Sequence, residues 1–155
     1  MRKPPLIETR PTEALTVLSV SPAEEVHFSL QAIFDHTKWK LSRTHSLPSA
    51  LAFIRAQEPP VVLCETDLLS GTWRDLLEHI PRNPNAPAVI VSSRLADDRL
   101  WAEALNLGAW DVLARPFIAS EVFHAVSAAW RHWRNQQESP AVAVQVMKAA
   151  AWASA

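Results

Sequence analysis

The sequence is poor in glycine, cysteine and metal-ligand patterns. Its only glycines are Gly71 and Gly108, so it lacks the Gly-rich loop through which backbone N–H groups cradle a nucleotide phosphate. The single cysteine, Cys64, excludes an intramolecular disulfide and is suited to a reducing compartment. The six histidines never occur in a paired ligand spacing beside cysteine, which argues against a zinc site.

Long hydrophobic runs and an excess of one charge are also missing. No stretch of about 18 apolar residues occurs, and the first residues, MRKPPLIETRPTEA, contain no apolar run long enough for a signal peptide. The formal net charge is −1, so no summed field attracts nucleic acid or an anionic membrane. We therefore expect a cytoplasmic protein without a membrane or nucleic-acid partner.

The chain is long and hydrophobic enough to form one compact domain, with 155 residues of which 48% are hydrophobic. Residues 1–13 contain three prolines and no periodicity, and we expect a flexible lead-in. We assign the domain to residues 14–137. The segment 138–155 is unusually apolar for a solvated tail, and we expect it to pack on the domain or on a second subunit.

Short apolar runs alternate with helical patterns along the domain. The predicted strands cover residues 15–20, 38–44, 60–65, 88–93 and 110–114, with helices after each strand at 22–34, 46–57, 72–80, 95–108 and 120–137. Residues 66–71 are predicted as a loop, and Ser21, Pro22 and Glu24 as a capping-box helix start. Five such units predict a doubly wound α/β domain with a parallel sheet and helices on both faces.

In a sheet of this kind, ligands bind at the carboxyl ends of the central strands. The residues at those ends are Ser21 and Pro22, Glu65 and Thr66, Ser92 and Ser93, and Arg115 and Pro116. The strand ends read VLSVSPAEE, VVLCETDLLSGTW, PAVIVSS and GAWDVLARPF. With these motifs, residues 15–135 resemble the receiver domain of bacterial response regulators. The resemblance implies the CheY-like, flavodoxin-like fold with strand order 2-1-3-4-5.

The resemblance also implies a set of site residues. Receiver domains hold a divalent cation on an acidic pair, accept a phosphoryl group on an aspartate, and contact it through a Ser or Thr and a Lys-Pro. A switch aromatic on the fifth strand completes the relay. The corresponding residues here are Ser21 and Pro22 (acidic pair), Glu65 (phosphoacceptor), Ser92, Arg115 and Pro116 (phosphate contacts), and Val112 (switch position).

Several of these replacements weigh against phosphoryl transfer. Ser21 and Pro22 offer no carboxylate for Mg²⁺, so we expect no metal or cofactor, although Glu24 and Glu25 remain minor alternative ligands. The longer side chain of Glu65 displaces its oxygens by on the order of 1 Å from the in-line geometry. Asp67 is a minor alternative acceptor.

A cation remains available to Glu65 at the sheet edge. An arginine is suited to pairing with a carboxylate, so we expect a Glu65–Arg115 ion pair near Ser92. Taken as an exposed pair, it should contribute roughly 0–1 kcal/mol to stability.

The seven tryptophans, with no tyrosine, point to protein contacts. Trp101, Trp130 and Trp133 belong to the segment 95–137, and tryptophan is enriched in interface hot spots. We expect a homodimer through this region, or a protein partner such as a sensor kinase or an output protein.

The sequence thus favours a stand-alone degenerate receiver, or pseudo-receiver, that is not an enzyme and acts as a phosphorylation-independent interaction module in signal transduction. The alternative is a phosphoaccepting response regulator of a two-component phosphorelay. A flavodoxin-like nucleotide or flavin binder is a weaker third possibility, because the chain lacks a Gly-rich loop.

Overall fold

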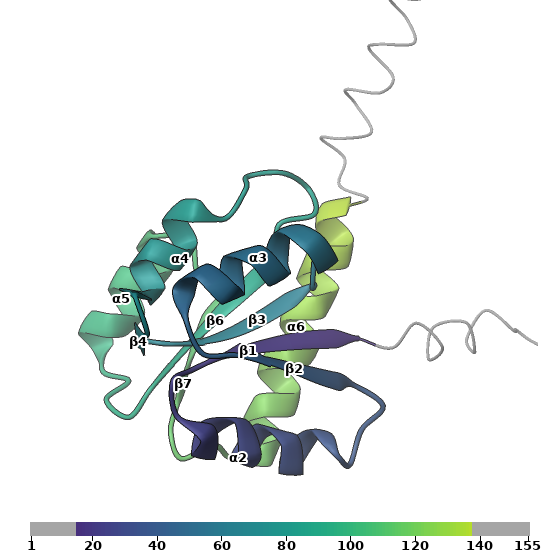
Figure 1. Cartoon of the computed structure of the whole chain (residues 1–155). Coiled ribbons are helices and arrows are strands. Elements are labelled where there is room, and N and C mark those ends of the chain that lie inside the picture. The colour runs from purple at the N-terminus through teal and green to yellow at the C-terminus, as the bar shows by residue number, and fades with distance from the viewer. Residues whose placement is uncertain (1–14, 138–155) are drawn as a thin grey trace, which may run out of the picture.

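The computed structural model describes residues 15–137, which form three layers: one parallel sheet lies between two layers of helices (Figure 1). The strands of the sheet are β1 (Thr16–Val20), β2 (Lys40–Thr44), β3 (Val61–Glu65), β6 (Ala88–Ser93) and β7 (Asp111–Ala114). The helices are α2 (Glu24–Phe34), α3 (Leu47–Gln57), α4 (Trp73–His79), α5 (Asp98–Asn106) and α6 (Ala119–Gln137). The strand order β2-β1-β3-β6-β7 confirms the predicted 2-1-3-4-5 topology. The predicted lead-in and apolar tail lie outside the described residues.

A hydrophobic cluster lies on each face of the sheet. Successive strand residues point to opposite faces, so Val62 and Cys64 of β3 join one cluster, and Val61 and Leu63 join the other. The first cluster packs against α3, α4 and α5, and the second against α2 and α6. Because β1, β3 and β6 are covered on both sides, their sequences are nearly continuous apolar runs.

The start of the first helix differs from the prediction. Helix α2 begins at Glu24, and Ala23 occupies the N-cap position without a side-chain hydrogen bond. The predicted capping box of Ser21 and Glu24 is therefore wrong. Ser21 instead accepts the Ala23 N–H at 3.0 Å and turns its own O–H toward the sheet edge. A full capping box occurs at α4, where Thr72 and Asp75 satisfy each other's backbone N–H groups.

The segment predicted as a loop contains a small hairpin. Strands β4 (Asp67–Leu68) and β5 (Gly71–Thr72) pair antiparallel directly after β3. The predicted glycine stop of α5 is confirmed: Gly108 has φ +107°, a left-handed conformation that costs glycine no Cβ clash.

Candidate functional site

Four predicted site residues meet at the carboxyl edge of the sheet. Ser21 follows β1, Glu65 ends β3, and Arg115 follows β7. Ser92 is the register partner of Glu65 on the neighbouring strand β6. The parallel arrangement brings these residues together, because the carboxyl ends of all five strands lie on one edge.

Glu65 forms the centre of the cluster. Its Oε2 pairs with Nη2 of Arg115, and its Oε1 accepts a hydrogen bond of 2.9 Å from the Ser21 hydroxyl. The predicted Glu65–Arg115 pair is thus confirmed. Its expected exposure is wrong, since the side chains are only 8% and 14% exposed, so the small contribution expected of a surface pair does not apply.

Burial shapes the chemistry around this pair. Among the described residues, Nε of Arg115 is a buried nitrogen without a hydrogen-bond partner, so the guanidinium is held mainly by Glu65. Next to Glu65, burial and then the carboxylate charge raise the pKa of the Cys64 thiol. Cys64 is therefore a protonated, unreactive core residue.

His27, which is not among the predicted site residues, contacts the backbone of Ser21 and so helps to position it. His27 is fully buried; its ring lies 3.0 Å (Nε2) from the Ser21 carbonyl and 2.9 Å (Nδ1) from the Ser19 hydroxyl. A carbonyl can only accept, so Nε2 carries the proton and Nδ1 accepts from Ser19. Burial lowers the pKa of His27, and the neighbouring His45 adds to this effect. Its helical spacing to Leu30 and Phe34, both core residues, was the signal for an inward-facing position.

The acidic alternatives lie outside the cluster. Glu24 contacts Arg43 and His45 on the surface, and Glu25 pairs with Arg94 at 3.3 Å. Asp67 is exposed in β4 and lines a separate cavity with Arg74. Within residues 15–137, no group of three or more His, Cys, Asp or Glu side chains is placed to hold a metal ion.

The remaining equivalents occupy different environments. Pro22 is exposed beside Ser21, and Pro116 follows Arg115 in the loop to α6. Val112 is buried in the cluster that packs against α3, α4 and α5.

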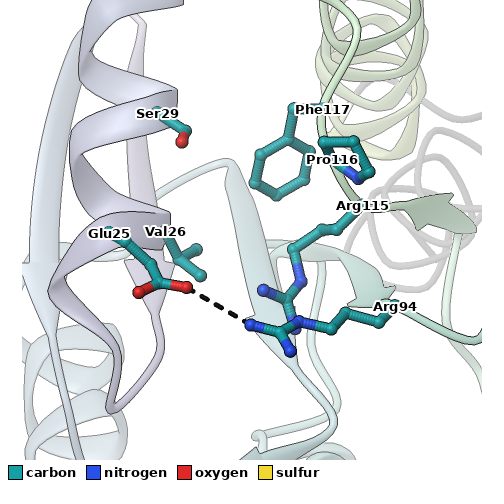
Figure 2. A pocket seen from close by; sticks show the side chains of 7 residues that line it. All are labelled: Glu25, Val26, Ser29, Arg94, Arg115, Pro116 and Phe117. Atoms are coloured by element: carbon teal, nitrogen blue, oxygen red, sulfur yellow. Dashed lines mark hydrogen bonds and ion pairs between the residues drawn. The ribbon is translucent and has the colours of Figure 1, made fainter.

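A cavity of about 340 Å³ opens beside Arg115, between α2 and the loop from β7 to α6. Figure 2 shows the Arg115 and Arg94 side chains entering it from one side, with Glu25 and Ser29 of α2 on the other. The dashed line marks the Glu25–Arg94 pair, which bridges the cavity.

The three candidate interface tryptophans differ in exposure. Trp101 of α5 is 49% exposed. Trp130 is half-buried against the second core cluster, with the Arg134 guanidinium 5.4 Å above its ring. Trp133 is also half-buried and donates Nε1–H to the Asn85 carbonyl at 3.3 Å. Trp101 therefore offers the most exposed indole of the three.

A five-stranded parallel sheet of this order, with its polar cluster at the carboxyl edge, is the architecture of a signalling receiver. The model of the response regulator receiver domain matches residues 17–127, and the chain belongs to this family. Receiver domains are signalling modules that interact with proteins such as kinases or output domains. No helix between residues 15 and 137 has the length and apolarity needed to cross a bilayer.

Solved receiver structures share the fold. The receiver domain of a putative Luxo repressor protein from Vibrio parahaemolyticus superposes with a TM-score of 0.75 at 17% identity, covering 82% of this chain and 98% of that one. The receiver domain of an HD domain-containing protein from Pseudomonas fluorescens gives a TM-score of 0.73 at 22% identity, covering 81% and 93%. At these identities the likeness concerns the fold.

One curated relative is longer than the matched region. A protein-glutamate methylesterase/protein-glutamine glutaminase from Desulfotalea psychrophila is 32% identical over 74 residues, which is 46% of this chain. The match spans only 20% of that relative's length.

Proposed function

We propose that this receiver domain is degenerate and acts as a phosphorylation-independent protein-interaction module in signal transduction. The observation that carries the proposal is the occupation of the acceptor position by a buried ion pair. Both carboxylate oxygens of Glu65 already have a partner, Arg115 on Oε2 and the Ser21 hydroxyl on Oε1, so a bond to an incoming phosphoryl group would have to disturb at least one of these contacts. At the acidic-pair positions, the hydroxyl of Ser21 and the ring of Pro22 provide no carboxylate for a divalent cation.

The proposal is tested by titrating the full chain with Mg²⁺ plus beryllofluoride or acetyl phosphate while recording tryptophan fluorescence. Trp73 is a local reporter, because its backbone N–H donates to the Thr66 carbonyl at 3.1 Å and its side chain is buried. We expect no saturable, Mg²⁺-dependent change. A saturable change that Glu65→Gln abolishes would overturn the proposal.

A phosphoaccepting regulator remains the second candidate, and one observation favours it. Asp67 is exposed within two residues of Glu65, on a cavity that is also lined by Thr66 and Ser93. Acyl-phosphate formation there would give a response that survives Glu65→Gln and disappears in Asp67→Asn. Intact-mass analysis after incubation with acetyl phosphate would reveal the added phosphoryl group directly.

We further propose that the interaction surface includes α5 and supports a homodimer. Trp101, Leu105 and Leu107 are exposed apolar residues on or next to this helix. A two-fold contact would bury them symmetrically. Light scattering at high micromolar concentration should give a dimer that Trp101→Ser weakens. The matched control is Phe28→Ser, at a 65% exposed position on α2. A strictly monomeric mass for the unmodified chain would exclude the dimer and leave a different protein as the partner.

A further inference from the structure

A second cavity lies at the amino edge of the sheet, opposite Glu65. It has a volume of about 320 Å³ and is bounded by the loop before β6, the turn before β7 and the last turns of α6. Its lining is mainly proline, alanine and aromatic: Pro84, Ala86, Pro87, Trp110, His132 and Trp133. Figure 1 shows the loop between α4 and β6 arching toward the end of α6.

The walls of this cavity are held in place by specific contacts. Trp110 stacks on His132 with ring centroids 4.3 Å apart and an interplanar angle of 17°. Asn85, at the tip of the loop, accepts hydrogen bonds from Trp133 at its carbonyl and from Gln137 at its side-chain oxygen. A preformed cavity of roughly 300 Å³ is at the small end of binding sites and has room for a few side chains; its proline, alanine and aromatic residues give apolar walls, and Asn83 and Gln136 add polar groups.

We propose that this cavity binds the apolar segment 141–147 of the same chain, AVAVQVM. The inference is independent of the phosphoryl chemistry at Glu65. The occupant is identified by where the chain leaves the described structure. Gln136 lines the cavity, and Gln137, the last described residue, bonds to Asn85 at its rim, so only three residues separate the rim from Ala141 in the sequence.

The sequence of the segment fits a cavity with proline, alanine and aromatic walls. Pro140 cannot continue a helix, which favours a change of direction just after α6. The next seven residues carry no charge and contain Val142, Val144 and Val146. A tether this short gives an effective concentration on the order of millimolar, which favours the segment of the same chain over that of a second copy.

Disulfide trapping in the full chain tests this contact. Cys64 is fully buried and its thiol has a raised pKa, so it does not compete with introduced cysteines. The test variant combines Ala86→Cys, on the cavity wall, with Ala143→Cys. The matched control combines Gln57→Cys with Ala143→Cys. Gln57 is exposed at the amino edge beside Glu58, which also reaches Asn85.

We expect an intramolecular disulfide in the Ala86 variant that forms about ten-fold faster than in the Gln57 control, as the higher effective concentration of a docked segment requires. Intact mass and non-reducing electrophoresis distinguish it from a crosslink between two chains. Equal rates in the two variants, or a crosslink that joins two chains, would overturn the proposal.

A second measurement does not depend on the cysteine variants folding. Incorporated 5-fluorotryptophan gives a ¹⁹F resonance for each indole, and single Trp→Phe variants assign those of Trp101, Trp110 and Trp133. Changing Val142, Val144 and Val146 to serine should shift the Trp110 and Trp133 resonances and leave that of Trp101 unchanged. No shift at Trp110 and Trp133 would show that the segment does not occupy the cavity.

Discussion

Arg115→Ala isolates the central contact of the site. The substitution removes the cation that faces Glu65 but leaves the carboxylate in place, and among residues 15–137 the Ser21 hydroxyl is the remaining side-chain donor to it. The Glu65 side chain is only 8% exposed, so in the folded chain little bulk water solvates the carboxylate that the guanidinium leaves behind. The variant therefore measures the cost of leaving a buried charge with one donor.

The magnitude follows from the burial of Glu65 and from the largely covered side chain of Arg115, which is 14% exposed. Removing one member of a buried ion pair typically costs about 3–5 kcal/mol, whereas an exposed pair contributes about 0–1 kcal/mol. With a urea m-value of about 2 kcal/mol per M, a loss of about 4 kcal/mol lowers the unfolding midpoint by about 2 M. The matched control is Arg94→Ala, whose pair with Glu25 has side chains 75% and 70% exposed, and whose midpoint should move little.

Urea unfolding followed by tryptophan fluorescence checks both values. A double variant, Glu65→Leu with Arg115→Met, removes both charges and should recover much of the lost stability, because neither group then remains buried and unpaired. An Arg115→Ala loss below about 1 kcal/mol, equal to that of Arg94→Ala, would refute the view that the pair is energetically buried.

Three further predictions concern other residues. The lowered pKa of His27 means that below the ordinary value of 6.5 the unfolded chain binds a proton that the folded chain resists. As the pH is lowered below 6.5, the free energy of unfolding measured with urea should then fall by up to about 1.4 kcal/mol for each pH unit. This fall should be less steep in His27→Leu, and it should be unchanged in the control variant His36→Asn, whose histidine is exposed. Breaking the exposed Arg74–Glu103 pair with Arg74→Ala should lower the unfolding midpoint only slightly, and less at high salt, in the same assay. The Cys64 thiol should react with a thiol reagent only after denaturation; rapid labelling of the native protein would contradict its burial.

The order of elements was predictable because burial leaves a periodic signal. Strand β3 is buried at every position and appears in the sequence as the run VVLCE, bounded by prolines and a polar loop. The end of α5 at Gly108 was predictable for a similar reason, because the preference for glycine after a helix depends only on the local backbone conformation. The hairpin of β4 and β5 was missed because two-residue strands are too short to show a period.

The burial of the site was not predictable from local sequence. Whether Arg115 points to solvent or across the sheet edge depends on Glu65, which lies 50 positions earlier in the chain. His27 illustrates the same limit. Its helical spacing indicated an inward position, but its partners Ser19 and Ser21 are defined only when α2 folds back on β1.

The wrong capping box shows how a residue that satisfies a local rule can take a different role in the folded chain. Ser21, Pro22 and Glu24 satisfy the local rule for a helix start, and a serine cap contributes about 1 kcal/mol. In the structure the Ser21 hydroxyl donates to a buried carboxylate, where a hydrogen bond to a charged group contributes roughly 1.5–3 kcal/mol, and its oxygen accepts the Ala23 N–H in place of the predicted Glu24 N–H. The first residues of α2, Glu24 and Glu25, are exposed, so water can satisfy the N–H groups there, whereas Glu65 is only 7% exposed. A hydroxyl can donate and accept at the same time, so Ser21 keeps both contacts and becomes part of the site.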